Sequence, residues 1–263
     1  AGPAGMEAAV TLKQRGFDVV VFDKRDEIGG NLHVAKKPPF KGKFEWAIDY
    51  YKSMAKKLNI TMKLGKEVTA QEVLALKPYS ILVATGSNVI SIPLEGLDQV
   101  QTVQAHDVLA NDMQFANKKV VVIGGGITGL ETALYINRQG TNQVSVVDML
   151  PEWPVDMLDM RYQNEALLEV RHCNDQGVAL FYNNKVVKFA DGKLFIESTK
   201  DGEVKELPAD VIVLSVGVKP NDALWQELLA SGHPSVWKAG DAIATGKINK
   251  AVLHGSKFGY SLN

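Results

Sequence analysis

One stretch, residues 118–139, restricts the folds open to this chain more than any other. It opens with an apolar, β-branched run at 120–123, which predicts a short buried strand. Three glycines follow, Gly124, Gly126 and Gly129, and residues 127–139 then carry a helical pattern. A strand that turns straight into a helix through glycines at this spacing predicts an α/β fold with a parallel sheet.

Each of the three glycines suits a different part of a phosphate-binding turn. Gly124 allows the tight turn, Gly126 has no Cβ to block a pyrophosphate, and Gly129 lets helix and strand pack closely. The alternative is a glycine-rich turn that binds nothing. The strand before the turn and the helix after it favour the binding interpretation.

The start of the helix and the end of the next strand complete the pattern. The first helical residues, Ile127 and Thr128, would offer free N–H groups and the positive end of the helix dipole to phosphates. Nineteen residues after Gly129, a second apolar strand ends in Asp148, whose carboxylate can accept hydrogen bonds from a ribose 2′-OH. Together these residues predict a dinucleotide-binding unit.

The same unit occurs twice, displaced by 124 residues. Gly2 falls on Gly126, Gly5 falls on Gly129, and a strand at 19–22 ends in Asp23. The opening glycine and its strand are absent from this first copy, and no Met starts the chain, so we expect a fragment that begins inside a phosphate-binding turn. The residues predicted to bind a nucleotide in this copy are Gly2, Pro3, Ala4, Gly5, Asp23, Lys24, Gly29 and Gly30.

Composition narrows the class of protein. The 263 residues are 46% hydrophobic and 22% charged with a net charge of −1, which gives no basic surplus for nucleic acid or a membrane surface. The single cysteine, Cys173, excludes an intrachain disulfide and a redox dithiol. We expect a cytoplasmic protein without a membrane span, predict no metal site, and name no catalytic side chain.

Further repeated features predict the domain organisation. A buried strand at 79–86 ends in the small residues Ala84, Thr85 and Gly86, and the strand at 211–216 closes with Gly217 in the same way. Short alternating strands with hairpin turns at 178–207 predict an antiparallel meander, and a loop is expected around Trp153. We predict one domain from residues 1–112 plus 220–263, and a second, residues 113–219, inserted into it.

The order of these motifs resembles that of two-dinucleotide flavoproteins similar to glutathione reductase. This resemblance implies two Rossmann-like domains, each with an antiparallel meander, of which the first binds FAD and the second NAD(P)H. The residues that carry it are Gly2, Gly5, Asp23, Gly29, Gly30, Ala84, Thr85, Gly86, Gly124, Gly126, Gly129, Gly217, Gly240 and Asp241.

Residues 29–54 narrow the resemblance further. They look like part of the C-terminal module of 2,4-dienoyl-CoA reductase, 2-enoate reductase and trimethylamine dehydrogenase, which are multidomain relatives of Old Yellow Enzyme. In that family a TIM barrel with FMN and a 4Fe–4S cluster precedes the module. The resemblance therefore implies an upstream barrel in the same polypeptide as partner, and it leaves the oligomeric state open.

The resemblance also implies roles for the site residues. Gly2 and Gly5 would face the FAD pyrophosphate, Asp23 the adenosine ribose, and Asp241 the ribityl chain, although Asp241 could instead cap a helix. ADP could take the place of FAD, as in trimethylamine dehydrogenase. In the second copy NADH is expected over NADPH, because the Asp148 carboxylate would repel a 2′-phosphate.

These implications predict a module that passes hydride from C4 of NADH to N5 of FAD. The electrons would continue to the upstream barrel, which would reduce an enoyl-type substrate, and we expect the fragment to be inactive alone. Two alternatives stay open. One is a structural domain that holds ADP without redox turnover, and the other is a stand-alone NADH oxidase that passes electrons to oxygen.

Overall fold

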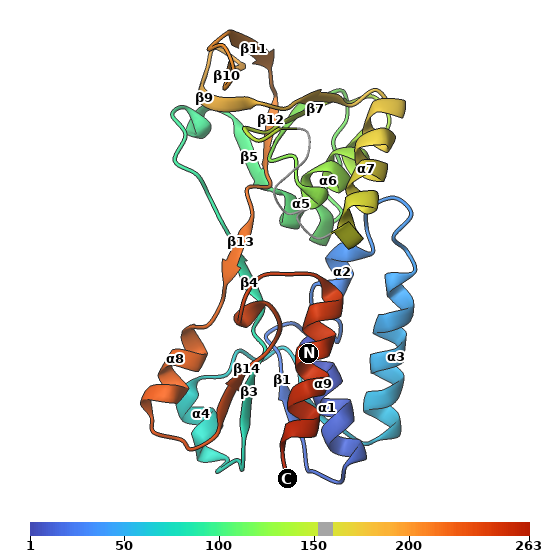
Figure 1. The fold of residues 1–263 in the computed structure, drawn as a ribbon, viewed down its shortest axis with the longest axis vertical. Helices are drawn as coiled ribbons and strands as arrows, with labels where there is room; N and C mark the ends of the chain where they lie inside the picture. The colour runs from blue at the N-terminus through green and yellow to red at the C-terminus, as the bar shows by residue number, and fades with distance from the viewer. Residues whose placement is uncertain (152–159) are drawn as a thin grey trace. The chain divides into compact units, whose positions relative to one another are not determined.

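The computed structural model describes residues 1–151 and 160–263, so the loop expected around Trp153 lies outside the described residues. The chain forms two compact units (Figure 1). Unit 1 comprises residues 1–36, 41–88 and 218–263, and unit 2 comprises residues 37–40 and 89–217. The α/β class, with one unit inserted into the other, is confirmed.

Unit 2 is built on a five-stranded sheet in which all neighbouring strands are parallel. Its central strands are rich in valine and buried on both faces, as expected of a covered parallel sheet. In sheet order the strands are β5 (Gln101–Gln104), β12 (Val211–Leu214), β6 (Lys119–Ile123), β7 (Gln143–Val147) and β8 (Ala179–Phe181).

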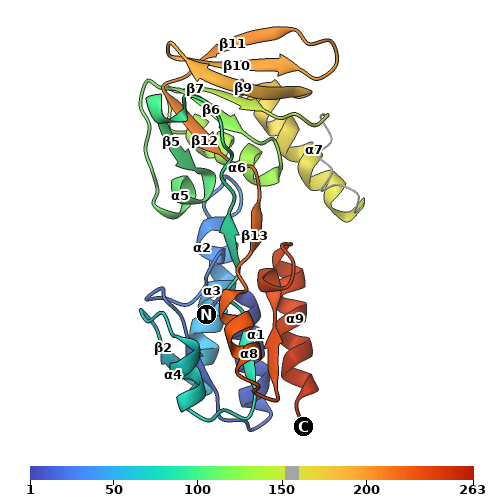
Figure 2. The same ribbon diagram turned by 90° about the vertical axis from the view of Figure 1, so that its left-hand side faces the viewer.

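The two faces of this sheet pack against different layers (Figure 2). Alternate side chains, such as Val120 and Val122, pack on helices α5 (Ala105–Ala110), α6 (Ile127–Asn137) and α7 (Met160–Asp175). Val121 and Ile123 point the other way, toward Leu194 and its neighbours in the antiparallel strands. The N-terminus of α6 lies at the glycine turn because the chain runs from β6 through that turn into the helix, and the alternation of side chains along β6 gives α6 one apolar face to pack on.

The antiparallel meander predicted at 178–207 is present in unit 2 as a three-stranded sheet. Asp191 and Gly192 connect its first two strands with φ angles of 53° and 74°, as a type I′ hairpin turn requires. The strands in sheet order are β11 (Val204–Pro208), β10 (Lys193–Ser198) and β9 (Asn184–Ala190). A 3-10 turn, η1 (Leu97–Gln99), precedes β5.

Unit 1 has its strands in pairs. β1 (Val20–Phe22) pairs in parallel with β2 (Thr61–Lys63), and β14 (Val236–Lys238) pairs in parallel with β3 (Ile81–Val83). β13 (Val218–Pro220) pairs with β4 (Ser87–Val89) where the chain passes between the units. The antiparallel meander expected in unit 1 is not found among its described strands, because each strand there pairs with a single neighbour.

In unit 1, α1 (Pro3–Gln14) packs against α9 (Ile248–Ser261) and α3 (Phe44–Lys57), whereas α4 (Ala70–Ala75) packs against α8 (Ala223–Ala230). Gly255 and Gly259 allow α9 to lie against α1, since a Cβ at Gly255 would be 2.1 Å from the Ala4 carbonyl oxygen. None of the helices in the described part of the chain is long and apolar enough to cross a membrane. The helices are α1 (Pro3–Gln14), α2 (Leu32–Ala35), α3 (Phe44–Lys57), α4 (Ala70–Ala75), α8 (Ala223–Ala230), η3 (Gly240–Ala242) and α9 (Ile248–Ser261).

The boundaries of the compact units differ from the predicted domain boundaries. Residues 89–112 were assigned to the first domain from the sequence, whereas they cluster with unit 2. The reason is long-range pairing: β5 lies in register beside β12, with Val103 opposite Val213. The assignment of a cofactor to each domain stays a prediction.

Candidate functional site

The glycine turn of unit 2 is held by packing as well as by backbone conformation. Gly124 has a φ of 111°, and a Cβ there would lie 2.2 Å from the Ser215 carbonyl oxygen. A Cβ at Gly129 would lie 1.9 Å from the Gly124 carbonyl oxygen. The Ser215 carbonyl therefore excludes a side chain at Gly124, and the contact between the turn and α6 excludes one at Gly129.

Gly126 is the N-cap residue of α6, and no side chain donates or accepts a capping hydrogen bond there. Of the following residues, Ile127 is partly buried and Thr128 is exposed. The first N–H groups of a helix have no intrahelical acceptor, so an uncapped N-terminus of this kind offers them to an anion. This geometry fits a pyrophosphate at the turn.

Asp148 lies beside the same turn. It follows β7, and its Oδ2 accepts a hydrogen bond from the Gly125 N–H at 2.6 Å, while its Oδ1 accepts one from the Leu150 N–H at 2.8 Å. Each carboxylate oxygen retains a lone pair for a further donor. The structure thus brings the predicted acid and the predicted phosphate turn together.

The first copy has a similar arrangement around Asp23. Asp23 Oδ2 accepts a hydrogen bond from the Ala1 nitrogen at 2.6 Å, and Asp23 Oδ1 accepts one from the Arg25 N–H at 2.9 Å. α1 also begins with a glycine N-cap, Gly2, without a side-chain hydrogen bond, and Pro3 occupies its first turn. Lys24, the neighbour of Asp23, is exposed.

The backbone at Gly29 and Gly30 packs directly against the backbone of the first turn at Ala1 and Gly2. The Gly29 N–H donates to the Ala1 carbonyl at 2.9 Å, and Gly30 has a φ of 53°. A Cβ at Gly30 would be 2.7 Å from the Gly2 Cα. Side chains are therefore excluded where the two backbone segments meet, which leaves peptide groups at the surface of the turn.

The other predicted residues of unit 1 lie around Asp241. Its Oδ1 accepts a hydrogen bond from the Gly246 N–H at 3.1 Å, and its Oδ2 accepts one from the Ser87 hydroxyl at 3.3 Å. Burial raises the pKa of this carboxyl above its ordinary value. Asp241 lies within η3, and the N-cap of α9 is Lys247, so the alternative helix-cap role for Asp241 is not observed.

The turn at Ala84, Thr85 and Gly86 is fastened to the returning chain. The Thr85 hydroxyl donates to the Asn221 carbonyl, and the Asn221 N–H donates to the Gly86 carbonyl at 3.0 Å. In unit 2, the Gly217 carbonyl accepts from the Ile90 N–H at 3.1 Å. Two further close approaches involve α1, where a Cβ at Gly5 would meet Ala84 at 3.6 Å and one at Gly240 would meet Ala4 at 3.0 Å.

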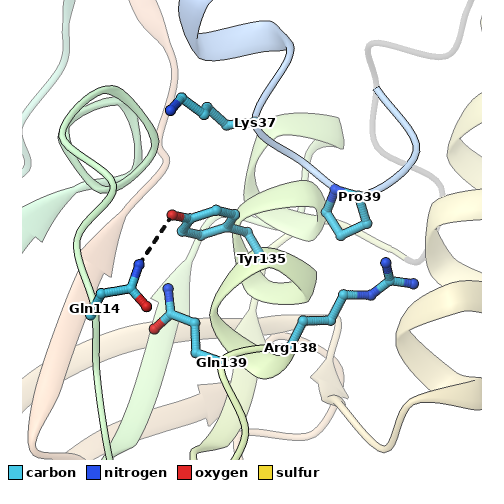
Figure 3. Close-up of a pocket in the computed structure, with 6 residues that line it drawn as sticks. All are labelled: Lys37, Pro39, Gln114, Tyr135, Arg138 and Gln139. Atoms are coloured by element: carbon cyan, nitrogen blue, oxygen red, sulfur yellow. Dashed lines mark hydrogen bonds between the residues drawn. The ribbon is translucent and has the colours of Figure 1, made fainter. Parts of the chain in front are cut away.

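Sequence reasoning missed a hollow of about 310 Å³ in unit 2 (Figure 3). It lies at the C-terminal end of α6, away from the glycine turn, and its floor includes the Tyr135 ring, whose hydroxyl accepts a hydrogen bond from the Gln114 amide at 3.5 Å. The residues that line it are Lys37, Pro39, Gln114, Tyr135, Arg138 and Gln139. No local signal could have indicated it, because residues 37 and 39 come from a distant part of the sequence.

Residues 37–40 make two contacts that involve a charged side chain with the rest of unit 2. The Lys37 ammonium pairs with Asp112 at 2.5 Å, and the Arg138 guanidinium lies 4.5 Å from the centroid of the Phe40 ring. Phe40 has a φ of 68°, which is uncommon for a bulky residue.

The lone cysteine is buried in the core of unit 2 beneath α6. Burial, with the nearby charge of Glu169, raises the pKa of the Cys173 thiol to about 12. Its Sγ lies 3.8 Å from the Leu130 carbonyl oxygen. Within the described residues, no group of three or more His, Cys, Asp or Glu side chains could hold a metal ion.

Two linked units, each with a glycine turn, an uncapped helix and a carboxylate on the turn, define a two-dinucleotide oxidoreductase fold. The chain belongs to the pyridine nucleotide-disulphide oxidoreductase family, whose sequence profile matches residues 1–253. It is thus an FAD-dependent oxidoreductase module that uses NAD(P)H.

Similar proteins are longer than this chain. An NADH oxidase of Thermoanaerobacter brockii is 31% identical over 99% of this chain and 40% of its own length, and a bilirubin reductase of Mediterraneibacter gnavus is 34% identical over 84% and 33%. The solved structure of a 2-naphthoyl-CoA reductase complex matches with a TM-score of 0.89 and 29% identity, over 100% of this chain and 39% of that one. The chain spans less than half the length of each, and the resemblance to the multidomain flavoproteins is confirmed.

Proposed function

We propose that this chain is the NADH-oxidising module of a multidomain flavoprotein. Unit 1 would hold FAD and unit 2 would hold NADH. When bound, the two cofactors supply hydride transfer from C4 of the nicotinamide to N5 of the flavin, and the electrons would continue to an FMN and 4Fe–4S barrel in the same polypeptide. The enoyl-type final substrate would react in that barrel.

One observation carries this proposal: in both units the carboxylate after the strand accepts a hydrogen bond from a main-chain nitrogen of its own glycine turn. In unit 2 it is Asp148, at 2.6 Å from the Gly125 nitrogen, and in unit 1 it is Asp23, at 2.6 Å from the Ala1 nitrogen. A dinucleotide needs phosphate donors and a ribose acceptor side by side, and each unit supplies both. The residues of each unit therefore fit one nucleotide, which makes two nucleotides per chain.

The side chains of this module would bind and orient, without taking part in proton transfer. The N–H groups at the starts of α1 and α6 would hold the pyrophosphates, and Asp23 and Asp148 would accept from ribose hydroxyls. Asp241 would accept a hydrogen bond from the ribityl chain in addition to its two protein donors. Hydride transfer between the two cofactors needs no side-chain acid or base. These groups therefore need only hold the cofactors in place.

The choice of NADH over NADPH follows from charge at Asp148. A 2′-phosphate adds roughly two negative charges, and within about 4 Å of a carboxylate each pair of unit charges costs about 4 kcal/mol at an effective dielectric constant near 20. Among the described residues, the hydrogen bonds to the Asp148 carboxylate come from backbone N–H groups and not from a Lys or Arg side chain that could offset its charge. NADPH binding should therefore be much weaker.

The test uses the full-length protein as isolated, under anaerobic conditions. Addition of NADH should bleach the flavin absorption band, and NADPH at the same concentration should do so far more slowly. Bound ADP without a flavin band would refute the redox proposal and support a structural nucleotide-binding domain.

A second candidate is supported by the similarity to an NADH oxidase over nearly the whole chain. In that case dioxygen would be the electron acceptor. NADH consumption matched by oxygen uptake at the full anaerobic rate of flavin reduction would support this alternative, and reoxidation that is slow in air would exclude it.

A further inference from the structure

The glycine turn of unit 2 contains one glycine more than its spacing requires. Gly125 occupies the variable position between Gly124 and Gly126, and its φ lies outside the left-handed region. A Cβ at Gly125 would lie 2.9 Å from Tyr182 Cε1 and 3.1 Å from the Asp148 Cβ. Glycine is therefore needed here because of its neighbours, chiefly the ring of Tyr182.

The duplication within the chain provides a comparison for this pair. In unit 2, Asp148 donates its N–H to the Phe181 carbonyl and accepts from the Asn184 N–H. In unit 1, Asp23 donates to the Lys63 carbonyl and accepts from the Lys66 N–H. These matched hydrogen bonds place the residue after Phe181, Tyr182, opposite the residue after Lys63, which is Leu64.

The same superposition places Gly125 opposite Ala1, because the Gly125 N–H and the Ala1 terminal ammonium each donate to the Oδ2 of the acid. Unit 1 therefore combines alanine with Leu64, and unit 2 combines glycine with Tyr182. The unit with the smaller turn residue, Gly125, has the larger aromatic residue, Tyr182, at the second position. In unit 1, Ala1 and Leu64 belong to one hydrophobic cluster, whereas in unit 2 the Tyr182 ring occupies the space that a Cβ at Gly125 would need.

Tyr182 is itself fixed at the end of β8. Its carbonyl accepts a hydrogen bond from the Asn184 side-chain amide at 2.8 Å, and its ring is partly buried in the core of unit 2. The ring therefore lies against the peptide whose N–H donates to Asp148. Ring, glycine backbone and carboxylate form one continuous set of contacts.

We propose that Tyr182 is a positioning residue that determines the preference of unit 2 for a nucleotide with a free ribose 2′-OH. Its ring holds the Gly125 peptide in place, and the Gly125 N–H holds the Asp148 carboxylate at the turn. Loss of the ring would let the peptide and the carboxylate move apart, so that a 2′-phosphate would meet less repulsion. This inference rests on the proposed ribose-binding role of Asp148.

Equilibrium binding of NAD⁺ and NADP⁺ to the oxidised full-length protein, measured by calorimetry, tests the proposal without turnover. The variant Tyr182→Leu should lower the ratio of NADP⁺ to NAD⁺ dissociation constants about tenfold, as expected for loss of one hydrogen bond to a charged group. Tyr182→Phe should leave the ratio unchanged, since the contact is made by the ring carbon Cε1. The double variant Gly125→Ala with Tyr182→Leu copies the pair of unit 1 and should recover much of the ratio.

The outcomes separate this inference from the function on which it rests. Wild-type protein that binds neither nucleotide would refute the proposed function. Wild-type protein that prefers NAD⁺, with a Tyr182→Leu variant that keeps the same ratio, would overturn the role of Tyr182 alone. If Tyr182→Leu does not fold, as judged by circular dichroism, Gly125→Ala alone should displace the ring and lower the ratio, and an unchanged ratio in that variant overturns the inference equally.

Discussion

Replacing Gly129 by alanine should separate helix α6 from the turn that precedes it. The added Cβ would lie 1.9 Å from the Gly124 carbonyl oxygen and 3.0 Å from its carbon, both of which are backbone atoms. Ordinary contact begins at 3.4 Å. The helix would therefore have to move by roughly 1.5 Å, or the turn would have to deform.

The expected cost follows from two opposing terms. Overpacking against backbone costs about 3 kcal/mol, and the better helix propensity of alanine offsets at most about 1 kcal/mol of it. The free energy of unfolding should thus fall by about 2 kcal/mol, or roughly thirtyfold in the ratio of folded to unfolded protein.

Urea unfolding followed by circular dichroism measures this change, and hydrogen exchange of the β6 and β7 amides locates it in unit 2. The control is Gly42→Ala, because a Cβ at Gly42 would meet nothing within 4 Å and the residue is not left-handed. Its effect should stay within about 0.5 kcal/mol. A Gly129→Ala protein as stable as the control would refute the packing argument.

Three further outcomes are expected. Cys173, with its pKa raised to about 12 by burial, should not react with a disulfide reagent until urea unfolds the protein, and rapid labelling of native protein would contradict this. Burial raises the pKa of Asp241 above 3.8, so the folded state favours the protonated acid and loses stability as pH rises through the raised pKa; urea midpoints of Asp241→Asn should lack this decline, and parallel curves would exclude it. Phe40→Ala removes the ring from the Arg138 guanidinium, which should cost about 0.5–1 kcal/mol and speed tryptic cleavage at Lys41, and unchanged cleavage would count against the contact.

Much of the fold could be predicted from local sequence. The strand before Gly124, the helix after Gly126 and the acid at Asp148 follow from periodicity and from glycine spacing, because these features act within a few residues of one another. The hairpin at Asp191 and Gly192 was predictable for the same reason, since a turn of this type needs φ above zero at both positions. The duplication needed only a comparison of the sequence with itself.

Other features depend on residues far apart in the chain. Residues 89–112 join unit 2 because β5 pairs with β12, and nothing in either strand specifies its partner. The expected meander in unit 1 was wrong for the described strands, since the resemblance implied it and the pairing there runs otherwise. The hollow at the end of α6 forms only when residues 37–40 lie against Tyr135 and Arg138.

The sequence by itself determined that this chain has two glycine turns. Each turn is followed by a helix, and the strand after that helix ends in an aspartate. Backbone conformation and helix polarity are local properties, so they can be read without a fold. Only the tertiary structure decided that the Asp23 and Asp148 carboxylates each accept a hydrogen bond from a main-chain nitrogen of their own turn, and that Tyr182 lies against Gly125. Those contacts join separate strands, and their geometry is set by how the sheet packs.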